Sequence, residues 1–230
     1  MKLSFITATY NGLGYTREML RSFHATVPSK TDDFEYIIVD DCSDDGTRGF
    51  LKTLAPPFRV ILSEENSGFA VANNKGAHAA TGDYLIFLNN DLLLTPGWLE
   101  PMLAAFQRFP KTGAVGNIQI NPKTRLIDHA GVFFDLQGRP SHARKNRKRC
   151  PQCPYTEWNA ITAACMIVPR SIFLDQDGFD ESYINGCEDI DFCLKLRVAG
   201  YRLMVANQSI IGHHVSTSPG RHSFNDRNSR

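Results

Sequence analysis

Short apolar runs alternate with helix-forming segments over the first hundred residues. Helices are predicted between strand-length apolar runs at 3–9, 34–39, 58–62 and 84–88. The run Tyr84–Leu88 is typical of a strand buried on both faces of a parallel sheet. Strict alternation of strands and helices indicates βαβ units with right-handed crossovers. The pattern therefore predicts an α/β, Rossmann-like fold, with a mostly parallel sheet flanked by helices.

The second half of the chain has a different pattern. Strands are predicted over 113–120, 126–135 and 161–168, without long helices between the first two. This spacing indicates a mixed sheet, and no Pro- or Gly-rich linker divides the chain, so we expect a single domain. A helix is predicted to start at Thr95, as N-cap, with Pro96 in its first position.

Composition excludes several classes of protein. The 230 residues are 42% hydrophobic, enough for a full core, and 25 basic against 24 acidic residues give a net charge of +1. A dedicated nucleic-acid binder normally carries a strong basic excess, so no nucleic-acid partner is expected. The amino terminus lacks the features of a signal peptide and no apolar run could span a bilayer, which predicts a cytoplasmic protein, with the inner face of the membrane as an alternative location.

The six cysteines do not form a disulfide framework in a chain of this size. Cys150 and Cys153 have the spacing of metal ligands, yet no second Cys pair or His pair follows at a zinc-finger distance. We interpret them as two loop thiols.

Polar side chains follow the ends of three predicted strands. The first strand ends in Thr7, Ala8 and Thr9 and is followed by Asn11, the second is followed by Asp40 and Asp41, and the fourth is followed by Asn89, Asn90 and Asp91. The carboxyl ends of parallel strands share one edge of a sheet, where α/β proteins bind ligands. A carboxylate there can hold Mg²⁺ or Mn²⁺, as Asp91 could, or accept a base N–H or a ribose hydroxyl, as Asp40 could. The alternative is a set of polar turns, and for Ser43–Asp45 we prefer a helix cap.

A further acidic cluster starts the predicted helix before Gly200. Glu188, Asp189 and Asp191 lie in its first turn, and acids there complement the helix dipole. The dipole explains one or two of these carboxylates. A carboxylate that faces an acceptor hydroxyl can also remove its proton as the hydroxyl attacks.

Five stretches, in this order, resemble the inverting nucleotide-sugar glycosyltransferases of family 2, which have the GT-A fold. They begin at Val39, Asn66, Asn89, Gly186 and Ile211. The resemblance implies that Asp40 reads the base, that Asn74 contacts the nucleotide, and that Asn89, Asn90 and Asp91 form the metal motif. We expect further contacts with the nucleotide sugar from Thr7, Ala8, Thr9 and Asn11 at the end of the first strand, and from Asn89 and Asn90. Asn89 stands where the family has Asp, so this motif supplies one acidic ligand, and Asp41 stands where Asn is usual.

The later stretches carry the remaining implied roles. Asp189 is the expected base, with Glu188 in reserve and Asp191 on the acceptor side. The resemblance implies His213 as a metal ligand that complements Asp91. Adjacent histidines cannot both point the same way, and His214 remains the alternative ligand.

The implied activity is transfer of a sugar from a nucleotide-diphosphate sugar, UDP- or dTDP-linked, to an acceptor hydroxyl. The acceptor would be a glycan or a lipid-linked saccharide, and transfer would proceed with inversion by metal-assisted direct displacement. We expect a nucleotide-sugar half over 1–98, an acceptor half over 99–220 and a polar tail over 221–230. The alternatives are a sugar nucleotidyltransferase and a non-catalytic carbohydrate-binding module.

The segment 139–149 is crowded with Arg and Lys and poor in apolar residues. We expect a mobile loop here, either simply solvated or acting as a lid whose cations meet a diphosphate or an acidic acceptor. Trp158 nearby could stack on a sugar ring on the acceptor side. The protein could in that case associate peripherally with a membrane.

Overall fold

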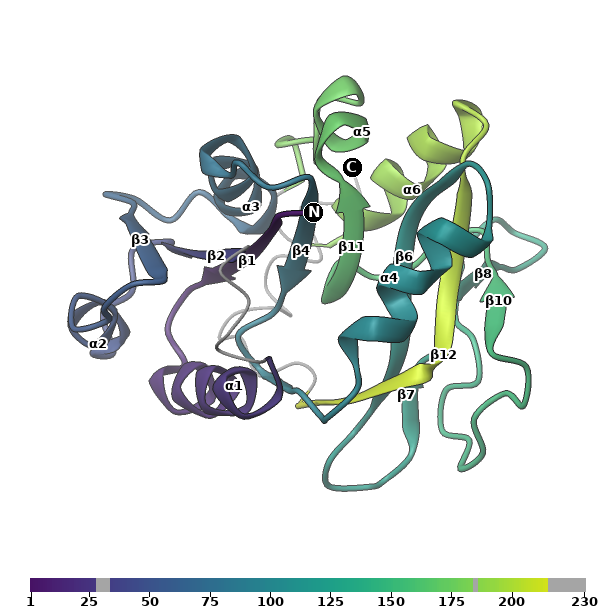
Figure 1. Ribbon diagram of the computed structural model, residues 1–230, viewed down its shortest axis with the longest axis horizontal. Helices are drawn as coiled ribbons and strands as arrows, with labels where there is room; N and C mark the ends of the chain where they lie inside the picture. The colour runs from purple at the N-terminus through teal and green to yellow at the C-terminus, as the bar shows by residue number, and fades with distance from the viewer. Residues whose placement is uncertain (28–33, 184–185, 215–230) are drawn as a thin grey trace.

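In the described residues, a mixed ten-stranded sheet with helices on both faces forms the body of the protein, and a separate two-stranded sheet accompanies it (Figure 1). The computed structural model describes residues 1–27, 34–183 and 186–214. The predicted tail 221–230 lies outside the described residues. The helices are α1 (Leu13–Thr26), α2 (Thr47–Leu51), α3 (Phe69–Ala79), α4 (Leu99–Arg108), α5 (Arg170–Asp175) and α6 (Glu188–Val198). The main strands are β1 (Leu3–Thr9), β2 (Phe34–Asp40), β3 (Phe58–Leu62), β4 (Tyr84–Leu88), β6 (Thr112–Ile120), β11 (Cys165–Pro169) and β12 (Arg202–His213). The short strands are β5 (Leu92–Leu93), β7 (Ile127–His129), β8 (Val132–Phe134), β9 (Pro140–His142) and β10 (Tyr155–Glu157).

The strand order confirms the predicted mixed sheet. It runs β10-β12-β6-β11-β4-β1-β2-β3, with β5 paired to β12 and β7 paired to β6. The strands β3, β2, β1 and β4 are parallel, as their alternation with helices predicts. In the second half, β11 is antiparallel to both β4 and β6, whereas β6 and β12 are parallel. The first half is therefore wound from βαβ units, and the second half is added at the β4 side.

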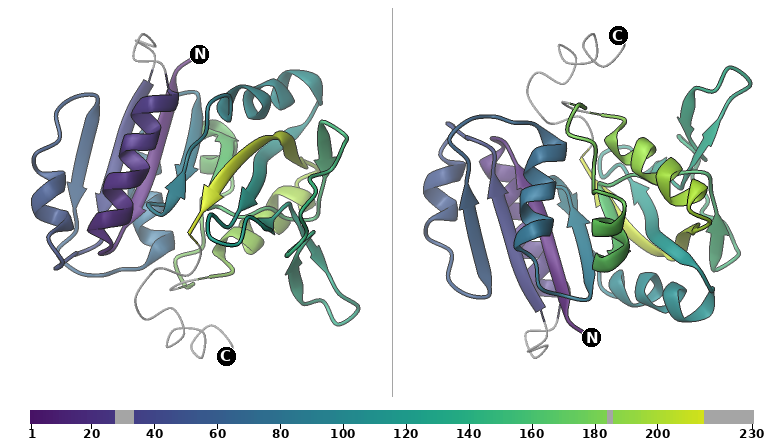
Figure 2. Two further views of the ribbon diagram at one scale, coloured as in Figure 1. Left: turned by 90° about the horizontal axis from the view of Figure 1, so that it is seen from below. Right: turned by 90° about the horizontal axis from the view of Figure 1, so that it is seen from above.

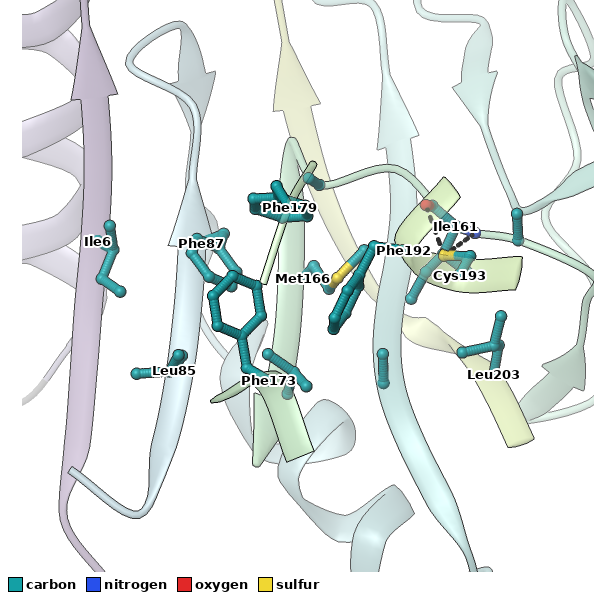
Figure 3. Close-up of a cluster of buried hydrophobic side chains, with 14 of the residues drawn as sticks. Ile6, Leu85, Phe87, Ile161, Met166, Phe173, Phe179, Phe192, Cys193 and Leu203 are labelled. Carbon is teal, nitrogen blue, oxygen red and sulfur yellow. Dashed lines mark hydrogen bonds between the residues drawn. The ribbon is translucent and has the colours of Figure 1, made fainter. Parts of the chain in front are cut away.

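The core consists of two apolar layers, one on each face of the sheet. One layer joins α3, α5 and α6 to the sheet through four phenylalanines, Phe87, Phe173, Phe179 and Phe192 (Figure 3). The other layer lies under α1 and α4. Helix α3 approaches the sheet closely because Gly76 lacks a side chain: a Cβ there would lie 2.5 Å from Ile6 Cγ2.

Three local predictions were wrong. The helix predicted from Thr95 begins at Leu99, and the Thr95 hydroxyl instead donates to the Ile210 carbonyl. The predicted strand 161–168 begins only at Cys165, because residues 161–164 form the loop that leads into β11. The segment 139–149 is not a structureless loop, since it contains β9 and a turn bonded to β7.

In the described part of the chain, no helix has the length and the apolar character needed to cross a membrane.

Candidate active site

The acidic groups of the two halves meet where β4 ends. The antiparallel pairing of β11 with β4 sets Cys165 opposite Leu88, so the loop 161–164 lies beside Asn89. The Asn89 N–H donates to the Ala164 carbonyl at 2.9 Å, and the Ala163 N–H donates to Asp189 Oδ2 at 3.0 Å. The first turn of α6 is thus held at the edge that carries Asn89, Asn90 and Asp91.

Asp91 and His213 form a buried pair at this edge. Strand β12 ends beside β5, with His213 opposite Leu92, and His213 Nε2 lies 3.2 Å from Asp91 Oδ1. His213 Nδ1 lies 2.7 Å from Gln119 Oε1. The amide oxygen can only accept, so Nδ1 donates to it, and Nε2 is the ring nitrogen that faces Asp91.

His214 points in another direction. Its ring lies against Tyr15, with centroids 5.1 Å apart, and its Nε2 lies 3.3 Å from Glu18 Oε2, both on α1. Only the side chain of His213 is directed at Asp91, while the His214 N–H donates to the Asp91 carbonyl at 3.0 Å.

The Asp91–His213 pair fits a divalent cation. A carboxylate oxygen and an imidazole nitrogen that face each other at 3.2 Å can both coordinate one cation, or share a proton between them. Adjacent ligands of an octahedral cation with bonds of about 2.1 Å are about 3 Å apart. Within the described residues there is no group of three or more His, Cys, Asp or Glu side chains able to hold a metal, so further ligands would come from substrate or water.

Asp40 is fully buried at the end of β2, on the same edge. Its Oδ2 accepts from the Ser43 N–H at 3.3 Å and lies 3.7 Å from Arg48 Nη1. Its Oδ1 is buried and has no hydrogen-bond partner among the described residues. A buried acceptor left unsatisfied costs about 1–3 kcal/mol, so this oxygen suits a ligand N–H or O–H.

Several side chains at the strand ends form hydrogen bonds with other protein groups at this edge of the sheet. The Thr7 hydroxyl is fully buried, 2.8 Å from the Tyr36 hydroxyl. The Asn90 amide donates to the hydroxyls of Thr9 at 3.0 Å and Thr16 at 3.1 Å, which ties β4 to β1 and α1. The side chains of Thr7, Thr9 and Asn90 were predicted to contact the nucleotide, and this prediction needs correction because these groups bind one another or the core.

Asn11 and Asp45 lock the ends of β1 and β2 together. Asn11 Oδ1 accepts from the Asp44 N–H at 2.9 Å and from the Asp45 N–H at 3.3 Å. Asp45 Oδ2 accepts from the Gly12 and Leu13 N–H groups at the start of α1, and Oδ1 accepts from the Thr47 N–H and hydroxyl. Although partial burial opposes the shift, these hydrogen bonds lower the pKa of Asp45 to about 2. The preferred capping interpretation of Asp45 therefore extends to two helices.

Asp41 caps a helix other than the next one in sequence. Its two carboxylate oxygens accept from the Ser67 N–H at 2.9 Å and the Gly68 N–H at 2.8 Å, just before α3. An Asn here could accept at only one of these positions, because its amide nitrogen would meet an N–H. Burial raises the pKa of Asp41 despite these bonds.

Asn74 does not face the edge, and its predicted nucleotide contact is wrong. Its side chain is buried: Nδ2 donates to the Phe179 carbonyl at 2.8 Å and to Glu181 Oε1 at 3.0 Å, and Oδ1 accepts from the Phe179 N–H at 3.0 Å. The amide thus binds the Phe179 backbone as a peptide group would, and it fastens α3 to the segment that leads to α6.

Asn74→Ala is expected to lower the free energy of unfolding by about 2–4 kcal/mol, because it leaves a buried backbone N–H and C=O of Phe179 without partners. Nucleotide affinity of the folded variant should be unchanged. Urea denaturation measures the first effect and calorimetric titration the second. Asn73→Ala is the matched control, since Asn73 donates only within its own helix, to the Phe69 carbonyl. A nucleotide-binding loss at normal stability would contradict the structural role.

The three acids of α6 have different environments. Asp189 bonds the site loop, as described above, and its Oδ1 accepts from the Ile190 N–H at 2.8 Å. Glu188 is buried, and its Oε2 accepts from the Gly186 N–H at 2.6 Å. Asp191 pairs with Lys195 one turn along the same helix, at 3.0 Å. Of these, Asp189 is the carboxylate bonded to the loop beside Asn89.

A second contact fixes α6 on the same loop. Cys193 Sγ lies 3.4 Å from both the N–H and the carbonyl of Ile161 (Figure 3). Burial raises the pKa of the Cys193 thiol far above its ordinary value, so it stays protonated and able to donate. Helix α6 is therefore attached to residues 161–163 at two points, which sets the position of Asp189.

Trp158 lies over the backbone of Gly131. A Cβ at Gly131 would lie 2.2 Å from the indole Cδ1, and the indole is partly buried. One face of the ring is therefore covered by protein. Stacking of a sugar on Trp158 stays a prediction.

Gln119 is the site residue that the sequence did not reveal. It is fully buried in β6 and it orients His213 through the 2.7 Å hydrogen bond. The available signal was a pair of polar residues, Asn117 and Gln119, within a predicted buried strand, because buried polar side chains need partners.

The strand order and the acidic edge together define the GT-A class of glycosyltransferase fold. The family model "Glycosyl transferase family 2" matches residues 4–175. This chain therefore belongs to glycosyl transferase family 2.

Relatives and solved structures agree with this assignment. The chain is 32% identical to the O-antigen biosynthesis protein RfbC of Myxococcus xanthus over 80% of its length, but spans only 15% of that protein. It is 27% identical to the N-acetylglucosaminyl-diphospho-decaprenol L-rhamnosyltransferase of Mycobacterium tuberculosis, over 80% of this chain and 68% of the relative. Among solved structures, GalNAc-T7 with UDP, GalNAc and Mn²⁺ superposes with a TM-score of 0.75 at 18% identity, covering 93% of this chain and 44% of that one.

Proposed function

We propose that this protein transfers a sugar from a nucleotide-diphosphate sugar, UDP- or dTDP-linked, to an acceptor hydroxyl with inversion. The observation that carries the proposal is the convergence of Asp91, His213 and Asp189. The first two lie 3.2 Å apart, and the third is bonded to the loop that pairs with Asn89. Family membership supports the reaction class, and RfbC, a relative named for O-antigen biosynthesis, supports a saccharide acceptor.

In this proposal the nucleotide half of the chain, 1–98, holds the donor. Asp40 Oδ1, which lacks a partner among the described residues, accepts an N–H of the base or a ribose hydroxyl. Asn89 lies at the β4 end, where its side chain can reach the donor. Asp91 and His213 would hold Mn²⁺ or Mg²⁺, which when bound would neutralise charge on the departing diphosphate.

The acceptor half, 99–220, supplies the base. Asp189 takes the proton from the acceptor hydroxyl as its oxygen bonds to the anomeric carbon from the face opposite the diphosphate. The bond from that carbon to the phosphate oxygen breaks, and its electron pair leaves with the diphosphate. Glu188, the reserve base, accepts from the Gly186 N–H through its Oε2. Asp191, paired with Lys195, lies on the acceptor side.

The acceptor is a glycan or a lipid-linked saccharide. One relative of this chain is named for a diphospho-decaprenol acceptor, and this name supports the lipid-linked alternative. A lipid-linked acceptor would place the protein at a membrane surface through peripheral association.

The function is tested by a donor screen followed by a transfer assay. Thermal shifts with UDP-, dTDP- and GDP-sugars, each with and without Mn²⁺, should identify one donor that stabilises the protein only with the metal. Incubation of that donor with saccharide acceptors should release the nucleoside diphosphate and give a glycoside of inverted anomeric configuration by NMR. Release of pyrophosphate from a nucleoside triphosphate would instead indicate a nucleotidyltransferase.

Gln119→Leu is expected to weaken Mn²⁺ binding about 10- to 100-fold, because His213 loses the acceptor that fixes its tautomer and orientation. Titration of Mn²⁺ followed by electron paramagnetic resonance measures this without any reaction. Gln119→Glu keeps an acceptor and should retain most of the affinity. Equal affinity in Gln119→Leu and the parent protein would contradict the positioning role.

A further inference from the structure

We propose that the basic turn formed by residues 144–149 is a binding site for a phosphate or diphosphate group, and that it takes the phosphate of a phosphorylated acceptor. The assignment of the ligand to the acceptor rests on the proposed function. The anion site itself rests on the charge, shape and position of this turn.

The charge of the turn is concentrated and largely uncompensated. It contains five cations and no acid, Arg144, Lys145, Arg147, Lys148 and Arg149, although the net charge of the whole chain is +1. The rest of the chain therefore carries a net charge of −4. Among the described residues, the ion pair within 4 Å that involves this turn is Lys145 with Asp128, at 3.8 Å. All six residues of the turn are exposed, so the other four cations are available to an anion from solution.

The shape of the turn suits a small anion. Four of its cations, Arg144, Arg147, Lys148 and Arg149, line a hollow of about 580 Å³. Guanidinium groups bind phosphate oxygens in pairs, and an ammonium group adds a point charge, so this set matches a phosphate or diphosphate.

Backbone hydrogen bonds hold the turn in place. The Asn146 N–H donates to the Ile127 carbonyl at 2.7 Å, and the Ile127 N–H donates to the Arg147 carbonyl at 2.9 Å. The Arg147 N–H donates to the Arg144 carbonyl at 3.0 Å. The cations are thus carried by a backbone that is bonded to β7, and less conformational entropy is lost on binding than with a free loop.

A row of laterally paired residues connects the turn to Gly212, the residue before His213. Arg147 bonds Ile127, Ile127 pairs with Ile120, and Ile120 pairs with Gly212, the residue before His213. Three strand spacings of about 4.8 Å separate the ends of this row, or roughly 14 Å.

A second connection leads to the acceptor base. The Ala143 N–H, next to the turn, donates to the Gly131 carbonyl at 2.8 Å, and the Val132 N–H donates to the Ala160 carbonyl at 2.8 Å. Ala160 precedes the loop 161–163, which holds Asp189. Figure 2 shows that the β8–β9 hairpin, which lies between β7 and this turn in the chain, projects on the side where β1 and β4 end. Backbone hydrogen bonds therefore connect the segment that carries the hollow to β7 and, through Gly131 and Val132, to the residue before the loop that holds Asp189.

The experiment measures binding of farnesyl diphosphate to the whole protein in EDTA, so that no metal holds the probe at Asp91. Arg147→Gln with Lys148→Gln should weaken binding at least tenfold, and added salt should weaken binding to the parent protein. Arg21→Gln with Lys52→Gln is the matched control, because it removes the same charge from exposed positions on α1 and after α2. Equal affinity in the two double variants would overturn the site.

Two further measurements identify the source of the phosphate. In transfer assays, Arg147→Gln with Lys148→Gln should raise KM for a phosphorylated acceptor at least tenfold and leave KM for its dephosphorylated form unchanged. Co-sedimentation with phosphatidylcholine vesicles, with and without phosphatidylglycerol, tests a lipid headgroup instead. Turn-dependent binding to the anionic vesicles with no change in either KM would overturn the acceptor assignment and leave the anion site standing. Turn-dependent binding of farnesyl diphosphate by a protein that transfers no sugar would refute the proposed function alone.

Discussion

Asp91→Ala is expected to abolish sugar transfer and, with it, the metal-dependent part of nucleotide binding. Asp91 supplies the single carboxylate of the pair that faces His213 at 3.2 Å, and the acidic motif has Asn at its first position, so this motif offers no other acid to replace it. Asp91 would act by holding the cation that neutralises the departing diphosphate. Removal of a single donor to a developing negative charge typically costs a factor of about 10² to 10³ in kcat, and loss of a whole cation should cost more.

The measurement is calorimetric titration of the donor nucleotide with and without Mn²⁺, beside the transfer rate. The parent protein should bind more tightly with Mn²⁺, and Asp91→Ala should bind equally in both conditions. His213→Ala should behave in the same way, whereas the matched His214→Ala should not, because His214 lies against Tyr15 and Glu18 on α1. A Mn²⁺-dependent gain in affinity that survives in Asp91→Ala would place the metal elsewhere.

The first half of the architecture was predictable from local sequence patterns, because the burial of each strand and the direction of each crossover depend on residues close in sequence. The apolar run of β4 requires burial on two faces, and the alternating helices require parallel crossovers, so the first half of the sheet followed from spacing alone. Elements of the second half were harder to bound. β12 extends as far as His213 because its far end is stabilised by pairing with β5, a contact distant in sequence.

The candidate site was only partly predictable, for a related reason. Residue type and position at a strand end indicate that a side chain is near the edge, but not which atoms its neighbours already occupy. Asn74 and Asn90 look like ligand-binding amides in the sequence, yet Phe179, Thr9 and Thr16 take their hydrogen bonds. Gln119 is the opposite case, since its role depends on His213, which lies 94 residues away in sequence.

Family resemblance and structure therefore contribute different information. The resemblance names Asp91, Asp189 and His213, which lie in three separate stretches, and it gives each a role. The structure shows that β12 brings His213 to Asp91, and that the loop 161–164 connects Asp189 to the same edge. Substitution of Asp91 should therefore affect metal-dependent nucleotide binding, and substitution of Asp189 should affect transfer alone.

Asp189→Asn is expected to lower kcat by about 10²- to 10⁴-fold while donor affinity with Mn²⁺ stays unchanged, because a base acts on the acceptor proton and not on the nucleotide. The amide retains one oxygen, which can accept from the Ala163 N–H, so the loop should keep its position, while the hydrogen bond from the Ile190 N–H is lost.

Asp191→Asn is the matched control on the same helix turn, since Asp191 pairs with Lys195 and makes no hydrogen bond to the site loop among the described residues. It should retain transfer to within about tenfold, because a partly exposed ion pair within one helix contributes little. Single-turnover rates at saturating donor and acceptor separate this loss from product release. A fall in donor affinity for Asp189→Asn as large as that for Asp91→Ala would refute the division of roles, because the two carboxylates would then serve the same ligand.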